Sequence, residues 1–196
     1  MLKKVIWGLA VVFTLGYCAH TEIESRNAQE QKNEARRAAE ARIDTNIAVL
    51  VEEHQANSDW EDKLTNYGDY RYDDVKTLEL QKEWIENGPI LFEGSIRDIS
   101  MLDGDSYTIN LNPLRFTAYH FFDADMELRL SCSKSMIDPL IEQHERLIKS
   151  WHGNGIAVIA EIGTIESRYR SDEEGDEVET KIGVGMCLEA IFTGRD

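Results

Sequence analysis

The feature that most limits how this chain can fold is a change of hydrophobic period near residue 89. Beyond that point apolar and polar residues alternate, which is typical of half-buried strands. Five such segments predict strands, over residues 90–99, 106–111, 126–132, 156–165 and 182–192. Between the third and fourth strands, Asp138 as N-cap and Pro139 as the first residue predict the start of a helix.

Glycines interrupt the first, fourth and fifth of these strands. Gly94 and Gly163 lie in mid-strand, where a residue without a side chain allows a bulge or a sharp bend. The order strand, strand, strand, helix, strand, strand is that of an OB-fold, in which bent strands close into a small barrel. We therefore expect a mainly β protein with helices: a five-stranded OB-fold barrel preceded by an N-terminal helical stalk.

The barrel region resembles the exported bacterial OB-fold proteins of the tRNA-anticodon-binding-like group. The likeness covers roughly residues 80–192. It is carried by Trp84, Gly88-Pro89-Ile90, Gly94-x-Ile96-x-Asp98-Ile99, Tyr107-x-Ile109-x-Leu111, Leu130-x-Cys132, Gly155-Ile156-x-Val158 and Gly185-x-Cys187. The resemblance implies an OB-fold and an exported protein, and it implies no enzymatic activity.

Composition divides the chain into four segments. Residues 1–19 read as a signal peptide or membrane anchor, and residues 20–56 as a helical stalk, because they lack Gly and Pro and are rich in Ala, Glu, Gln and Arg. Residues 57–74 are acidic and contain turn formers, which favours an irregular linker. Residues 75–196 form the expected OB-fold domain, whose first helix ends at Asn87-Gly88-Pro89.

The N-terminus has the features of an export signal. Lys3 and Lys4 precede an apolar run over residues 5–19, shorter than the roughly 20 residues that span a bilayer. Leu15-Gly16-Tyr17-Cys18 resembles a bacterial lipobox, although Tyr17 stands where a small residue is usual. Three fates follow: lipidation at Cys18, retention of the run as an anchor, or cleavage after Ala19. Each places the remainder in the cell envelope, on the periplasmic side.

The remaining two cysteines fall in predicted strands. Cys132 ends the third strand and Cys187 lies in the fifth, and these strands are neighbours in an OB barrel. Matched positions on adjacent strands satisfy the geometry of a disulfide, which an oxidising compartment would close. The alternative is a pair of buried, reduced thiols, which follows if a register offset turns them to opposite faces.

Charge argues against nucleic acid as a partner. The chain has 21 basic and 37 acidic side chains, a net charge of −16. Residues 89–196 alone contain 10 basic and 20 acidic side chains, hence −10. Duplex binding draws much of its affinity from cations that neutralise phosphates. We therefore expect no binding to tRNA or duplex DNA at physiological salt.

A candidate ligand site follows from the OB-fold itself, which binds ligands on the second and third strands and the adjoining loops. Aromatic and basic residues gather in and around that region. The candidate ligand-binding residues are Arg97, Tyr107, Arg115, Phe116, Tyr119 and Arg129. The alternative for the aromatic residues is a structural role in closing one end of the barrel.

Catalytic and metal-binding patterns are lacking. Ser131 and Lys134 have Ser-x-x-Lys spacing, but the serine ends a strand, and the partner motifs of that enzyme class do not follow. The five histidines have no metal-binding spacing. We expect no enzyme activity, no catalytic residues, no cofactor and no metal.

The sequence thus predicts a non-enzymatic, membrane-tethered envelope protein that binds a protein or a small ligand through its OB-fold. The alternative is a structural or phage-derived envelope component that acts through its helical stalk. Ile43, Ile47 and Leu50, with Val51 and His54, form a short apolar stripe that would support coiled-coil association.

Overall fold

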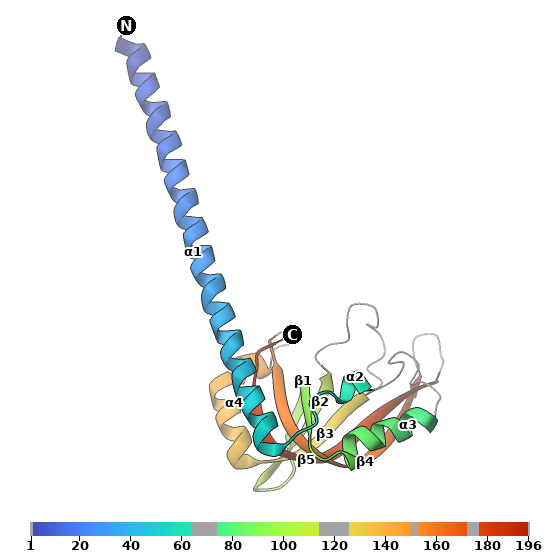
Figure 1. Ribbon diagram of the computed structural model, residues 1–196. Coiled ribbons are helices and arrows are strands. Elements are labelled where there is room, and N and C mark those ends of the chain that lie inside the picture. Colours follow the sequence, from blue (N-terminus) through green and yellow to red (C-terminus); the bar gives the residue numbers. More distant parts are fainter. Residues whose placement is uncertain (1, 64–73, 114–125, 150–152, 172–176, 196) are drawn as a thin grey trace. The chain divides into compact units, whose positions relative to one another are not determined.

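A computed structural model describes residues 2–63, 74–113, 126–149, 153–171 and 177–195. It contains a closed five-stranded barrel, with the strands hydrogen-bonded in the order β1-β2-β3-β5-β4 and β4 returning to β1 (Figure 1). One helix, α4, separates β3 from β4. The predicted fold class, an OB-fold-like barrel that follows an N-terminal helix, is confirmed.

The strands are longer than the sequence segments that predicted them. Their bounds are β1 Ile90–Met101, β2 Ser106–Pro113, β3 Met126–Ser133, β4 Gly155–Ser171 and β5 Glu177–Phe192. All neighbouring pairs are antiparallel except β3 and β5, which run parallel and close the barrel. A parallel pair between the third and the last strand needs a long connection, which α4 and the antiparallel strand β4 together supply.

Period-two alternation builds the core. In β1, every second residue from Ile90 to Ile96 is buried, and the others are partly exposed. Ile109 and Leu111 of β2 pair with Leu130 and Leu128 of β3, and all four side chains are fully buried. The alternation therefore sends one face of each strand into the barrel interior, as the sequence predicted.

The bend predicted at Gly94 lies elsewhere in β1. Gly94 is paired in register with Pro113 on one side and Ile156 on the other, while the register shifts between Ile96 and Asp98. Gly94 has a different role. A Cβ at this position would lie 2.6 Å from the Asn112 carbonyl oxygen, so only glycine permits the close approach of β2. Gly163, in contrast, falls at a register shift of β4, as expected.

Cys132 and Cys187 form a disulfide, with Cα atoms 4.9 Å apart. Ser131 pairs with Met186 in the β3–β5 ladder, so the two cysteines occupy the next matched position. Cys132 is buried in the core, and Cys187 packs against it. The predicted pairing is thus confirmed in preference to two reduced thiols.

One end of the barrel is closed by tryptophans. They come from the short helix α2 (Trp60–Lys63) and from η1 (Lys82–Glu86), a π-helical turn that continues helix α3 (Asp74–Gln81). Trp60 meets Trp84 edge to face at a centroid distance of 5.3 Å and stacks on Phe92 at 6.0 Å. The chain then turns at Gly88, whose φ of 88° is the left-handed conformation typical of a residue that ends a helix.

The N-terminal helix α1 runs continuously over Leu2–His54 and contains Cys18. By its contacts the chain divides into two compact units, Met1–Thr45 and Asn46–Asp196, so the last turns of α1 belong to the second unit. There Ile47 is buried, whereas most side chains of residues 26–45 are exposed. Within the described part of the chain, no helix is long and apolar enough to span a bilayer.

Candidate functional site

The site begins with the bulge in β1. Ile96 pairs with Leu111 and Asp98 with Asn110, so Arg97 has no partner position in β2. An extra residue of this kind bends a strand and increases its local twist. The bulge thereby opens one wall of a groove between β1 and helix α4, which we name the β1–α4 groove.

A short turn holds the bulge in place. The Asn154 side-chain amide donates to the Ile96 carbonyl oxygen at 2.7 Å, and the Ile96 N–H donates to the Asn154 carbonyl oxygen at 3.3 Å. The turn needs glycine on both sides of Asn154. Gly153 has a φ of 68°, and a Cβ on Gly155 would lie 2.8 Å from the Thr193 hydroxyl oxygen. These bonds satisfy buried polar groups and fix the shape of the groove wall.

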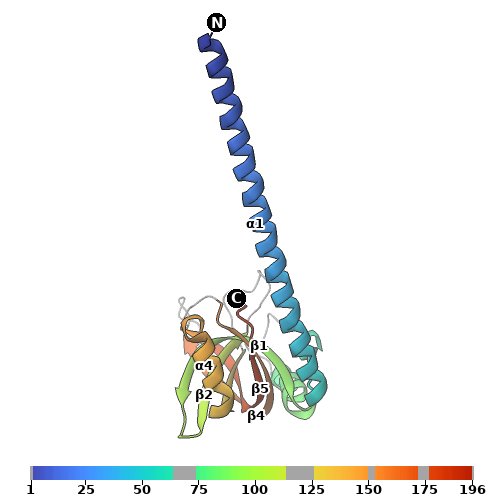
Figure 2. The same ribbon diagram turned by 90° about the vertical axis from the view of Figure 1, so that its left-hand side faces the viewer.

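Helix α4 (Lys134–Ile148) forms the opposite wall and lies against β2, β3 and β5 (Figure 2). It starts one turn earlier than predicted, with Ser133 as N-cap and Pro139 inside the helix. The prediction of Asp138 as N-cap is therefore wrong. The early start is possible because the Lys134 N–H donates to the Asp105 carbonyl oxygen of the β1–β2 turn at 2.9 Å.

Asp138 has another function, as the partner of the groove residue Tyr107. It accepts a hydrogen bond of 2.8 Å from the Tyr107 hydroxyl, which joins α4 to β2. This hydrogen bond, with burial and the charge of Asp138, raises the pKa of Tyr107 above its usual value. Further along α4 the backbone departs from helical geometry at His144, whose ring stacks on Phe192 at a centroid distance of 4.0 Å.

The β1–α4 groove has a volume of about 530 Å³. Four isoleucines form its apolar part: Ile96, Ile99, Ile141 and Ile148. Its ionisable groups are balanced, two basic and two acidic: Arg97, Lys149, Asp98 and Glu145. Uncharged polar residues complete it: Ser95, Tyr107, Asn112 and Asn154. The size and the mixture of apolar and polar groups are those of a small-molecule site.

Asn112 lines this groove and has an unpaired acceptor beneath the groove surface. Its side-chain oxygen is buried and has no hydrogen-bond partner among the described residues. Buried polar atoms in proteins are nearly always paired, so this unpaired oxygen is unusual. No sequence signal marks Asn112 or Asn154 as a site residue, because both acquire their place only when β1, β2 and α4 meet.

The structure brings together two of the six predicted ligand residues. Arg97 and Tyr107 both line the β1–α4 groove. Arg129 does not line it, and instead pairs with Glu166 of β4 at 3.1 Å. The other three, Arg115, Phe116 and Tyr119, lie outside the described residues.

Arg97 is held at the groove by a buried carboxylate. Its Nη1 atom lies 2.8 Å from Glu127 Oε1, and Arg168 binds the same oxygen from β4. The Glu127 side chain is only 9% exposed, whereas both guanidinium groups are partly open to solvent. This arrangement orients Arg97. A guanidinium carries five N–H groups, so further donors remain for a bound molecule.

A serine and a lysine also meet in the β4–β5 hairpin. Lys181 Nζ lies 3.1 Å from Ser167 Oγ and 2.8 Å from Glu179 Oε1, and Tyr169 donates to the same carboxylate oxygen. Burial acts to raise the pKa of Glu179, but hydrogen bonds from Lys181, Ser167 and Tyr169 outweigh it and lower the pKa overall. Glu179 therefore accepts the hydrogen bonds of Lys181 and Tyr169 as an ionised carboxylate at neutral pH.

The lowered pKa of Glu179 predicts a pH-dependent contribution to stability. A carboxylate with a depressed folded-state pKa stabilises the fold above its unfolded pKa, near 4.5, and loses that effect as pH falls through the folded pKa. Glu179→Gln is therefore expected to destabilise the protein at pH 7 and to differ less from wild type as the pH falls below about 4. Urea midpoints at several pH values measure this, with Glu142→Gln on exposed α4 surface as the control. A constant difference between Glu179→Gln and wild type at all pH values would contradict it.

No group of three or more His, Cys, Asp or Glu side chains suited to a metal occurs among the described residues. Comparison of the chain with protein families, with curated proteins and with solved structures finds no match.

Proposed function

We propose that this protein is a non-enzymatic binding protein of the cell envelope, tethered by its N-terminus, whose OB-fold takes a small ligand in the β1–α4 groove. The observation that carries the proposal is the meeting of Arg97 and Tyr107, both predicted from sequence, in one groove of about 530 Å³. Membership of the tRNA-anticodon-binding-like exported group is part of the same proposal, supported by the strand order of the barrel.

The groove chemistry favours one class of ligand. Its isoleucines favour an apolar body, and its two positive and two negative side chains cancel. A ligand with a strong net charge would be repelled by the two groove side chains of the same sign. An uncharged or zwitterionic amphiphile would not. We therefore propose a small amphipathic ligand without net charge.

Filling the groove tests the proposal. Ser95 lies on the groove wall and is partly exposed, so Ser95→Phe is expected to fill the cavity and weaken binding at least tenfold. The measurement is a protein-observed NMR titration with a library of uncharged amphipathic fragments. Ser100→Phe, on exposed surface of the same strand, is the matched control. Fragments that bind both variants equally well, or shifts confined to residues outside the groove, would refute the assignment.

The N-terminal tether is proposed from the Leu15-Gly16-Tyr17-Cys18 motif and the lysines before it. Lipidation predicts that radiolabelled fatty acid is incorporated into the wild-type chain and not into Cys18→Ser. Fractionation should recover the labelled chain with membranes. Equal labelling of both chains, or of neither, contradicts lipidation, and recovery of the intact chain in the cytosol contradicts export.

The alternative proposal assigns the role to helix α1, as a structural or phage-derived envelope component. It is supported by the exposure of most side chains over residues 26–45. Ile47 of the apolar stripe is buried within the second unit, which leaves less of the stripe for a partner helix. Deleting residues 21–42 separates the two proposals, because ligand binding in the groove should survive the deletion and helix-mediated association should not.

A further inference from the structure

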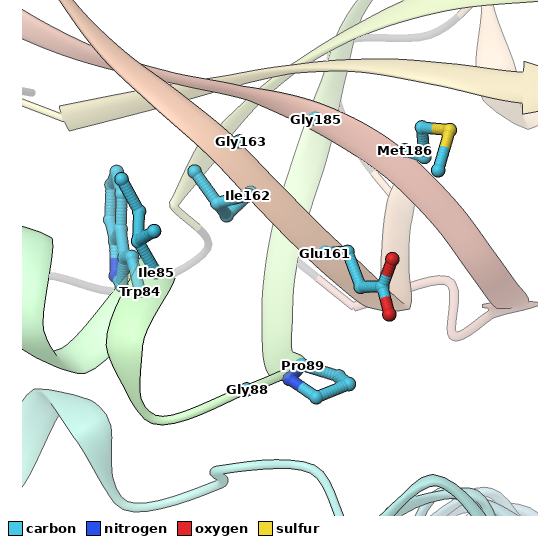
Figure 3. Close-up of a pocket in the computed structure, with 9 residues that line it drawn as sticks. All are labelled: Trp84, Ile85, Gly88, Pro89, Glu161, Ile162, Gly163, Gly185 and Met186. Carbon is cyan, nitrogen blue, oxygen red and sulfur yellow. The ribbon is translucent and has the colours of Figure 1, made fainter.

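Two hollows of the barrel differ in how their walls are held. One, of about 310 Å³, lies between η1 and strands β4 and β5, and its lining includes Trp84, Ile162 and Met186 (Figure 3). Its walls are fixed, because β4 and β5 are paired with each other and Trp84 is buried in the core. The β1–α4 groove is different, because one of its walls is a strand of the barrel and the other ends in an interrupted helix.

The interruption of α4 lies at His144. Its φ of −127° and ψ of 19° are not helical, although the helix continues to Ile148. Sharp kinks are usually caused by proline, by glycine or by an inserted side chain. Residues 142–146 contain neither proline nor glycine. Pro139 clashes with the carbonyl group four residues before it, and so acts on the other end of the helix. The local sequence therefore favours a continuous helix at His144.

A contact from outside the helix accompanies the kink. The His144 ring stacks on Phe192, the last residue of β5, with the ring centroids 4.0 Å apart and the planes inclined by 13°. Such stacks stabilise a protein modestly, and a straight helix would regain a backbone hydrogen bond of similar strength. The kinked, stacked form of α4 and a straight, unstacked form are therefore close in free energy.

The kink divides the α4 wall of the groove. Ile141 lies before it, whereas Glu145, Ile148 and Lys149 lie after it. Within the described part of the chain, the hydrogen bonds and ion pairs of residues 145–149 stay inside the helix, as in the 2.6 Å pair of Lys149 with Glu145. Ile148 packs against the core and is only partly buried. This last turn thus lies against the barrel without a polar contact to β1.

We propose that residues 145–149 form a lid over the β1–α4 groove, hinged at His144 and held down by the stack on Phe192. When the stack breaks, residue 144 becomes helical, α4 straightens, and the lid moves away from β1. Movement of an end segment about one backbone position is a common way to admit a ligand. The inference rests on the proposed function of the groove, but the movement itself needs no ligand.

NMR relaxation dispersion on the ligand-free, full-length protein tests the lid. Opening of this kind takes microseconds to milliseconds, so the amides of residues 145–149 should share one exchange rate. Residues 135–143 should show no such exchange. The Cα chemical shift of residue 144 should be non-helical in the major state and helical in the minor state. Flat profiles over residues 145–149, or a single exchange process over the whole of α4, would overturn the proposal.

Substitutions at the hinge separate the stack from the helix. His144→Ala removes the ring and favours helix, so it should raise the population of the minor state about fivefold. His144→Phe keeps a ring for the stack and should leave that population within about twofold of wild type. Gln143→Ala is the matched control, because Gln143 is exposed and already helical. Equal minor-state populations in wild type and His144→Ala would overturn the role of the stack, and with it the lid.

The lid and the ligand site can fail separately. Uncharged amphipathic fragments titrated into wild type and Ser95→Phe test the groove as a site. A fragment that binds the groove should suppress the exchange of residues 145–149, because it selects one of the two states. Binding that leaves this exchange unaltered would overturn the lid and keep the site. Exchange in the ligand-free protein without binding of any fragment would support the lid and refute the site.

Discussion

Replacing Cys132 and Cys187 together by alanine is expected to lower the free energy of unfolding by about 4 kcal/mol. The disulfide joins residues separated by 55 positions, and a cross-link of that span removes much of the freedom of the unfolded chain. It also ties β3 to β5, the one parallel pair of the barrel. For a chain of this size, 4 kcal/mol corresponds to a fall in Tm of about 12 °C.

The measurement is urea unfolding of the oxidised wild type, the reduced wild type and the double alanine variant. The two chains without the disulfide should unfold at similar, lower urea concentrations. Cys18→Ser provides the control, because Cys18 lies outside the bonded pair and its loss should leave the midpoint unchanged. An unchanged midpoint of the wild type after reduction would contradict the prediction.

Most of the barrel follows from residues that are close in sequence. Alternation predicts each strand because a strand sends successive side chains to opposite faces, and this holds whatever the partner strand is. The same local logic predicts the turn at Gly88, whose φ of 88° suits glycine. It also brought Cys132 and Cys187 onto neighbouring strands once the order of elements was recognised as that of an OB-fold.

Other features depend on contacts that sequence spacing does not show. Trp60 lies in the segment interpreted as a linker, yet it is buried in the core because Trp84 and Phe92 surround it. The early start of α4 depends on a carbonyl group from Asp105, in a distant turn. Such long-range partners decide the outcome where local signals are weak or point elsewhere.

The candidate site shows the same limit. Arg97 and Arg129 both looked available for a ligand, but each has a carboxylate partner from another strand, 30 and 37 positions away. Only Arg97 remains at a groove, where it stands at the bulge in β1. The bulge falls at Arg97 and not at Gly94, where the sequence predicts a bend. The position of the groove therefore depends on how β1 pairs with β2 in the closed barrel.

Gly185→Ala is expected to destabilise the fold by about 3 kcal/mol, a large cost for one methyl group. Gly185 of β5 pairs with Ile162 of β4 beside the register shift at Gly163. A Cβ on Gly185 would overlap the carbonyl oxygen of Glu161 and lie 2.8 Å from its carbon and 2.9 Å from the Ile162 Cα. Because these are backbone atoms, rotation of a side chain cannot remove the overlap with the new Cβ. The two strands must therefore move apart.

Gly163→Ala is the matched control, since it adds the same methyl group to the neighbouring strand. There the nearest atom to the new Cβ is the Val184 carbonyl oxygen at 3.8 Å, an ordinary contact. We expect its stability to change by less than about 1 kcal/mol, toward higher values, because alanine restricts the unfolded chain. Urea unfolding of the three proteins measures the difference. Equal midpoints for Gly185→Ala and Gly163→Ala would show that the strands separate without cost, and that the close approach at Gly185 is not what holds β4 and β5 in register.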